Sequence, residues 1–280
     1  MTGRNRLPVF YPSHINLYLQ CPERYLHERI ERVRPEQSFS PALAKGIAIH
    51  EILADASRIY RFQSHQGMGP AVPADLVVRA GAKLPQTPYA SELAWNADVE
   101  AVVHAVKNGL QYLDGQAQVV ATEATYRFSY LRGEDCPDFT LASKVDLVLL
   151  KQNADGRPFL DVIDYKSGAS PRHDSIQELA SRIVVKQNAA QLGHQFDYIQ
   201  STTLHVAAGT ARSAVLDDDE CGMVWRQMKG AVSSILQGEN WEPVPSPLCE
   251  WCPFFDNGCS LTPEGQASGD MASWLDSVAV

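Results

Sequence analysis

Two residues in one short segment have the types and the spacing needed for metal-assisted hydrolysis of a phosphodiester. Residues 161–168 read Asp-Val-Ile-Asp-Tyr-Lys-Ser-Gly, so Asp164 and Lys166 stand two positions apart at the end of an apolar run. Side chains alternate between the faces of a strand, and these two therefore share one face. A carboxylate there can hold a divalent cation, while the ammonium steadies or deprotonates the attacking water. Alone, the motif is weak, because composition makes an Asp-x-Lys common.

A second apolar run just upstream carries a single acid. Within residues 139–150, which are rich in leucine and β-branched residues, that acid is Asp146. The intervening segment 152–158 contains Asp-Gly and Pro, which predicts a hairpin turn. A carboxylate inside such a run needs a cation or hydrogen-bond donors. Across the hairpin, Asp146 and Asp164 could share one hard cation, magnesium or manganese rather than zinc. The structural alternative is a buried hydrogen bond from Asp146 to a neighbouring loop.

The motifs resemble, in order, those of the PD-(D/E)XK nucleases and, within them, the RecB-like exonucleases. That family has a helix with a histidine, a strand with an aspartate, a strand with Asp/Glu-x-Lys and a helix with a glutamine. Residues 46–53, Gly-Ile-Ala-Ile-His-Glu-Ile-Leu, resemble the histidine helix. The later motifs are matched by Asp146, by Asp164-Tyr165-Lys166 and by Gln191-Leu192.

The resemblance implies a role for each matching residue. The metal ligands implied are His50, Asp146, Asp164 and the Tyr165 backbone carbonyl. Lys166 would then serve the water, and Gln191 would contact the substrate strand or buttress the site. Without the downstream acids, His50 would instead be interpreted as a core-facing histidine.

The chain departs from the family pattern at two positions. Ser143 stands three residues before the first acid, where a glycine is common, and Gln195 stands where the last motif usually has a tyrosine. Tyr198 lies seven residues after Gln191, a spacing that returns to the same helix face. Tyr198 is therefore expected to replace the missing tyrosine as a substrate-binding residue.

Cysteine spacing gives a second signal. Three of the six cysteines, Cys249, Cys252 and Cys259, are close together near the C-terminus, and Cys21 stands alone near the N-terminus. Nothing at the N-terminus looks like a secretory signal, so disulfides are not expected. Structural zinc more often uses two close Cys-x₂-Cys pairs.

One distant cysteine plus a trio resembles the iron–sulfur staple of RecB-like nucleases, such as AddB-type subunits and CRISPR spacer-acquisition nucleases. The resemblance implies a [4Fe–4S] cluster on these four thiolates that ties the chain's ends together. Six residues separate Cys252 from Cys259, where the family often has five. Zn²⁺ at the same cysteines and reduced thiols are the alternatives. Cys136 and Cys221 are expected to be a loop thiol and a buried or partly buried one.

Several helices and strands must carry these side chains to one place. Helices are expected over 13–30 with a break at Cys21-Pro22, and over 41–61, 91–114, 175–198 and 218–236. Besides the hairpin, strands are expected over 118–130, 203–207 and 211–215. Glu123 is a candidate further acid near the site. The Gly- and Pro-rich stretch 66–87 is expected to be a loop.

This order predicts an α/β fold, with a restriction-endonuclease-like core made of a central mixed β-sheet flanked by helices. One nuclease domain is expected over 1–280. Its parts are an iron–sulfur staple at 10–35 and 241–262, which joins the N- and C-terminal segments as a small subdomain, a helical segment carrying His50 at 40–115 and a catalytic core at 116–216.

Charge and composition restrict the classes of protein to which the chain can belong. The formal net charge of −9 is unusual for a nucleic-acid binder. Acids at 217–220 fit a helix N-terminus, whereas basic residues gather at 24–34 and 172–186 and could line a groove. No run of about 18 apolar residues offers a membrane span, and a cytoplasmic location is expected.

Together these features predict a deoxyribonuclease that uses Mg²⁺ or Mn²⁺. An exonuclease is expected, acting on single-stranded DNA or DNA ends in repair, recombination or defence and leaving a 5′-phosphate and a 3′-hydroxyl. One alternative is a weakly catalytic or non-catalytic subunit that binds DNA ends and docks a helicase or integrase, although the complete Asp, Asp, Lys set argues against it. Another is a structure-selective endonuclease.

Overall fold

The computed structural model of the chain describes residues 7–34, 39–64, 72–86, 89–113, 117–131, 134–168, 174–215, 218–255 and 259–261. In chain order its elements are β1 (Val9–Phe10), α1 (Pro12–Gln20), α2 (Pro22–Tyr25), the π-helix η1 (Leu26–Ile30), α3 (Pro41–Ser64), α4 (Leu76–Lys83), α5 (Glu92–Gln111), β2 (Gln118–Tyr130), β3 (Phe139–Gln152), β4 (Pro158–Lys166), α6 (Ser175–Gln187), α7 (Ala189–Leu192), β5 (Tyr198–His205), β6 (Thr210–Ala214), α8 (Asp218–Gln237) and the 3₁₀ helix η2 (Pro247–Trp251).

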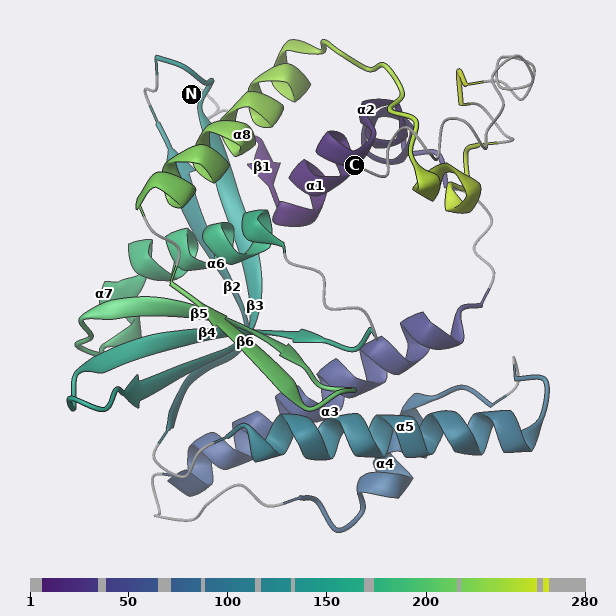
Figure 1. Cartoon of the computed structure of the whole chain (residues 1–280), viewed down its shortest axis with the longest axis vertical. Helices are drawn as coiled ribbons and strands as arrows, with labels where there is room; N and C mark the ends of the chain where they lie inside the picture. Colours follow the sequence, from purple (N-terminus) through teal and green to yellow (C-terminus); the bar gives the residue numbers. More distant parts are fainter. Residues whose placement is uncertain are drawn as a thin grey trace, which may run out of the picture.

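The strands form one mixed sheet with helices on both faces (Figure 1). Its order is β1-β3-β4-β5-β6, and β2 pairs with β3. The β1–β3 and β4–β5 pairs are parallel, and the other pairs are antiparallel. The expected α/β class with a central mixed sheet is confirmed, as is the 139–166 hairpin.

Strand β3 changes partner along one edge, and this creates an opening in the sheet. Its first residues pair with β1 at Thr140 and Leu141, whereas its pairing with β4 starts only at Leu147, opposite Ile163. Along that edge, residues 142–146 of β3 have no backbone partner among the described strands. Polar side chains can therefore occupy this opening without breaking a ladder hydrogen bond.

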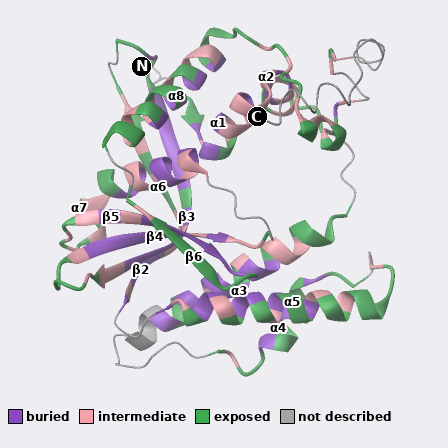
Figure 2. Cartoon of the chain, in the orientation of Figure 1, coloured by how far each residue is buried: buried purple, intermediate pink, exposed green. Residues whose placement is uncertain are grey.

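Apolar side chains bury both faces of the sheet, as the buried segments in Figure 2 show. Helices α3 and α5 cover one face, where Leu53 and Val102 share a core cluster with Ile163, and α4 packs on α3 and α5. Helices α1, α6 and α8 lie together on the other side, around Phe139 and Met228. Helix α3, which carries His50, is thus fixed against the sheet by its buried side.

Two expectations about elements were wrong. The stretch 66–87, expected to be a loop, contains helix α4, because Leu76 and Ala80 lie one turn apart and are both buried in the core. The helix expected to run to residue 198 ends at Gln187, and after α7 the left-handed Gly193, with φ of 69°, turns the chain. Strand β5 then begins at Tyr198, five residues before the expected start.

Candidate active site

Three carboxylates lie on three neighbouring strands. In the β2–β3 register, Thr122 pairs with Leu147 and Ala124 with Val145, so Glu123 lies opposite Asp146. On the other side of β3, Asp164 follows Ile163, which pairs with Leu147. Like charges opposed across strands destabilise a sheet. The row Glu123, Asp146, Asp164 therefore needs compensating positive charge.

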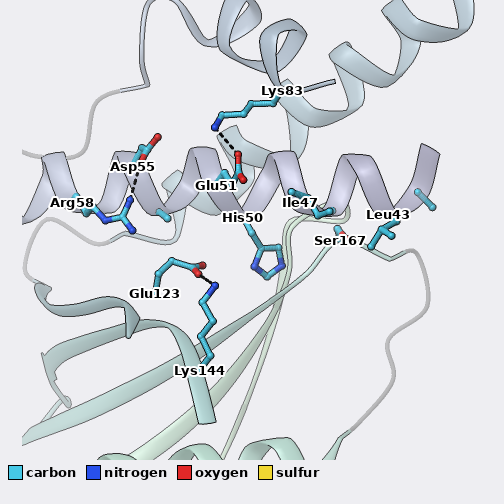
Figure 3. Close-up of a pocket in the computed structure, with 13 residues that line it drawn as sticks. Leu43, Ile47, His50, Glu51, Asp55, Arg58, Lys83, Glu123, Lys144 and Ser167 are labelled. Atoms are coloured by element: carbon cyan, nitrogen blue, oxygen red, sulfur yellow. Dashed lines mark hydrogen bonds and ion pairs between the residues drawn. The ribbon is translucent and has the colours of Figure 1, made fainter. Parts of the chain in front are cut away.

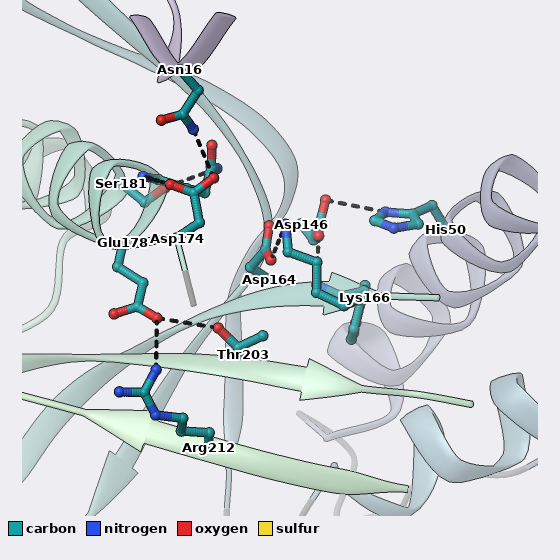
Figure 4. Close-up of polar contacts among 12 residues, drawn as sticks. Asn16, His50, Asp146, Asp164, Lys166, Asp174, Glu178, Ser181, Thr203 and Arg212 are labelled. Carbon is teal, nitrogen blue, oxygen red and sulfur yellow. Dashed lines mark hydrogen bonds and ion pairs between the residues drawn. The ribbon is translucent and has the colours of Figure 1, made fainter. Parts of the chain in front are cut away.

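Asp146 occupies the opening between β3 and β4 and is fixed from two sides (Figure 4). Its Oδ2 accepts a hydrogen bond of 2.8 Å from the Tyr165 backbone N–H, and its Oδ1 lies 3.3 Å from His50 Nδ1. The Tyr165 N–H thus donates to a side chain of β3 rather than to the β3 backbone. Burial lowers the pKa of His50, but the hydrogen bond and charge of Asp146 outweigh it, and the net shift is upward.

Asp164 and Lys166 form an ion pair of 2.7 Å on β4. Burial raises the pKa of Asp164 to about 6, although the charge of Lys166 works in the opposite direction. Burial likewise lowers the pKa of Lys166, but the Asp164 carboxylate raises it more, so the net shift is upward. In this arrangement Lys166 is an ammonium that stands beside the carboxylate.

Glu123 faces the same site from β2 in an unusual backbone conformation. Its φ is 50°, a left-handed value that is uncommon for any residue with a side chain. One carboxylate oxygen, Oε2, pairs with Lys144, and the other, Oε1, is buried with no hydrogen-bond partner. Residues held in such strained conformations cluster at functional sites.

The cluster of candidate metal ligands contains Glu123 in place of Asp164, which the resemblance implied as a ligand. Among the described residues, His50, Glu123 and Asp146 form the group of three ligand atoms that all lie within 4.8 Å of one another. Asp164, which is turned toward Lys166, is not part of that group. A histidine nitrogen and carboxylate oxygens suit a divalent cation.

An open cavity of about 700 Å³ adjoins this group beneath α3 (Figure 3). Residues lining it include His50, Glu51, Lys83, Glu123, Lys144 and Ser167. Gly46 of α3 lets the strand end approach, because a Cβ at that position would lie 3.0 Å from Ser167 Oγ. The cavity gives a substrate access to the cluster from solvent.

On the other side of Asp146 and Asp164, the N-terminal turn of α6 closes the site. Gln177 and Ser181 line a narrow pocket with both acids. Asp174 caps this helix by accepting a 2.8 Å hydrogen bond from the Gln177 N–H, and Asn16 of α1 holds Asp174 at 2.8 Å. Sequence reasoning missed Gln177, although a glutamine at the start of the helix after β4 was a usable signal.

The structure does not bring Tyr198 to the acids, and Gln191 is an exposed residue of α7 that lines neither pocket beside them. Tyr198 pairs with Phe159 and stacks on its ring at 4.9 Å, whereas Asp164 pairs with Thr203. The five residue steps from Tyr198 to Thr203 along β5 correspond to about 16 Å of strand. The helical spacing used to place Tyr198 beside Gln191 was wrong, because Tyr198 begins a strand.

The four cysteines that were expected to act together line one small pocket. Cys21 lies between α1 and α2, and Cys249 and Cys252 lie in and just after η2. The Ser246 N–H donates to Cys249 Sγ at 3.3 Å, and the Cys259 thiol donates to Glu23 Oε2 at 3.1 Å. Burial raises the pKa of Cys259 to about 12, and the hydrogen bond to Glu23 adds to the shift.

The other two cysteines lie apart from this pocket. Cys136 is a buried loop residue whose thiol donates to the Lys229 carbonyl at 3.5 Å. Cys221 of α8 is half-buried and accepts a contact of 3.8 Å from Arg182.

A mixed sheet bearing acids and a lysine around a cation-ligand cluster defines a class of metal-dependent hydrolases, and comparison with known proteins identifies the family. The chain belongs to the PD-(D/E)XK nuclease superfamily, whose family model matches residues 10–256. Membership implies a nuclease that uses divalent metal ions, and the His50, Glu123, Asp146 group offers ligands for one.

One solved structure that matches is entitled "Crystal structure of SSO0001"; it is 11% identical, with a TM-score of 0.39, over 91% of this chain and 85% of that chain. No curated protein matches the sequence. Within the described part of the chain, no helix has both the length and the apolar character needed to cross a membrane.

Proposed function

We propose that the protein is a RecB-like, divalent-metal-dependent DNA exonuclease that acts on single strands or DNA ends. The observation that carries the proposal is the meeting of His50 from α3, Asp146 from β3 and the Asp164-Tyr165-Lys166 segment of β4 at one opening in the sheet. The order of these motifs along the chain supports the RecB-like subtype.

Each residue has a distinct task in the proposed reaction. His50, Asp146, Asp164 and the Tyr165 carbonyl would hold the cation, which would supply polarisation of water and of the scissile phosphate. The Tyr165 N–H orients Asp146, and this leaves Oδ1 directed toward His50. Lys166, as an ammonium, would orient the attacking water by a hydrogen bond and stabilise the negative charge that develops at the phosphate. Water would attack phosphorus and lose its proton to solvent, and the 3′-oxygen would leave and take up a proton, which gives a 5′-phosphate and a 3′-hydroxyl.

End-labelled single- and double-stranded DNA, incubated with Mg²⁺ or Mn²⁺, tests the proposal. The wild-type chain should shorten the DNA stepwise from an end, and excess chelator should stop it. Lys166→Ala should retain Mn²⁺ binding and lose cleavage by on the order of 10²-fold or more, as expected for loss of a group that stabilises charge in the transition state. Undiminished cleavage by this variant, or cleavage that survives chelator, would refute the assignment. Internal cuts in circular DNA would point to an endonuclease.

We also propose that Cys21, Cys249, Cys252 and Cys259 hold a [4Fe–4S] cluster that joins segments 10–35 and 241–262. All four residues line one pocket, which supports this grouping. Zn²⁺ at the same four cysteines is the alternative.

A further inference from the structure

We propose that Glu123 is an additional ligand of the active-site cation, and that Lys144 is the internal cation that it releases when the metal binds. This inference rests on the proposed nuclease function and assigns two further residues to the same site. Neither residue belongs to the ligand set that the resemblance implies.

The position of Glu123 is the first support. It lies opposite Asp146 in the β2–β3 register, and its carboxylate shares the group of ligand atoms within 4.8 Å with His50 and Asp146. Its side chain is only 13% exposed, and its Oε1 is buried with no hydrogen-bond partner. A buried, unpaired carboxylate oxygen costs free energy, and a cation at this point would satisfy it.

The backbone is the second support. Strand β2 has a bulge between Val119 and Ala121, and Glu123 has a φ of 50° just beyond it. Bulges redirect side chains and are frequent beside active sites. A left-handed glutamate in a strand persists only where the surrounding structure imposes it, and here it places a carboxylate beside Asp146.

Lys144 is the third support. It stands two residues before Asp146 on β3 and is the partner of Glu123 Oε2, yet its side chain is 58% exposed to the cavity. Glu123 and Lys144 repeat the pairing of Asp164 and Lys166, so each outer carboxylate of the row carries one ammonium. A divalent cation on Glu123 and Asp146 makes the Lys144 charge redundant there. Its long side chain can then reach a DNA phosphate in the cavity.

Calorimetric titration of the whole chain with Mn²⁺ gives the decisive measurement, because the two variants should move in opposite directions. Glu123→Gln removes a ligand and should weaken Mn²⁺ binding by roughly ten- to a hundredfold, the range seen when groups that support a metal are lost. Lys144→Met removes a competitor and should tighten Mn²⁺ binding, while DNA cleavage falls. Loss of a merely structural ion pair would not tighten binding in either variant.

The neighbouring pair Glu51–Lys83 supplies matched controls. It lines the same cavity but lies outside the ligand group. Glu51→Gln and Lys83→Met should therefore leave Mn²⁺ affinity unchanged. Amine-reactive labelling read by mass spectrometry should show Lys144 becoming more reactive when Mn²⁺ is added, with Lys83 unchanged.

Wild-type Mn²⁺ affinity in Glu123→Gln would remove Glu123 from the ligand set. Weakened Mn²⁺ affinity in Lys144→Met would refute the proposal that Lys144 competes with the metal for Glu123. The Asp146→Asn variant distinguishes failure of the proposed nuclease site from failure of the present inference. If Asp146→Asn binds Mn²⁺ as wild type does, the metal site itself is misplaced, whereas loss of binding in Asp146→Asn with no effect of Glu123→Gln refutes only the present inference.

Discussion

At the scale of single residues, the site concentrates like charges that a soluble protein normally keeps apart. Glu123, Asp146 and Asp164 occupy adjacent strands, and their compensation comes from Lys144, Lys166 and His50. Each acid therefore has a positively charged or polar partner even without a metal ion. We therefore expect the chain to fold without a cation, and under the proposal above a bound cation would compete with these internal partners.

The contribution of Asp146 to metal binding can be measured through the stability of the protein. In Asp146→Asn the amide oxygen can still accept the hydrogen bond from the Tyr165 N–H, so the fold should survive without loss of thermal stability. Wild-type protein should gain about 2.7 kcal/mol of stability at a Mn²⁺ concentration of about 100 Kd. Thermal unfolding with and without Mn²⁺ checks this, and an equal gain in Asp146→Asn would contradict the assignment of Asp146 as a ligand.

At the scale of elements, the site depends on how closely α3 packs on its neighbours. Gly46 allows α3 to approach the end of β4 at Ser167, and Gly109 of α5 allows the second helix to approach Leu53 of α3. Leu53 is fully buried and lies one turn after His50. Gly46 permits the close approach of α3 to the end of β4 beside His50, and Gly109 permits the close packing of α5 on α3.

Gly109→Ala should destabilise the protein although alanine favours helix. The new Cβ would lie 2.7 Å from Leu53 Cδ2, and such overpacking typically costs about 1–3 kcal/mol, more than the roughly 1 kcal/mol gained in helix propensity. Gly230→Ala on the exposed side of α8 is the control. No atom lies within 4 Å of its added Cβ, so it should stabilise by about 0.5–1 kcal/mol. Urea unfolding of both variants would contradict this view if the two shifted stability in the same direction.

At the scale of the whole molecule, the two ends of the described chain meet at the cysteine pocket. Figure 1 shows α1 and α2 beside the segment that carries η2. A direct link also exists, since Glu23 Oε1 accepts a 2.9 Å hydrogen bond from the Ser260 N–H. The proposed cluster would close a loop of over two hundred residues, and a cross-link that closes a long loop restricts the unfolded chain strongly.

Cys21→Ser should therefore affect the entire fold. It removes the one ligand contributed by the N-terminal segment, so anaerobically purified protein should lose its brown colour and its broad visible absorption. Its unfolding temperature should fall as one cooperative transition, while Cys136→Ser, outside the pocket, should change neither property. Colourless wild-type protein with one equivalent of zinc would replace the cluster by a zinc clamp, and full stability in Cys21→Ser would remove Cys21 from the site.

The sequence by itself determined the features that rest on local patterns. Alternation and a turn signal predicted β3, β4 and their hairpin, and the Asp-x-Lys spacing placed Asp164 and Lys166 on one face of β4. Apolar periodicity predicted α3, α5 and α8 to within a few residues. These elements follow from interactions between residues close in the chain, so the amino-acid order was sufficient.

Only the tertiary structure decided which side chains meet at the opening of the sheet. The approach of Glu123 to Asp146 depends on a bulge and a left-handed φ in β2, and the closing of the site by Gln177 depends on where α6 packs. The separation of Tyr198 from the acids depends on α6 ending early. Register, bulges and helix ends are set by packing between segments far apart in the chain, and local sequence patterns do not encode that packing.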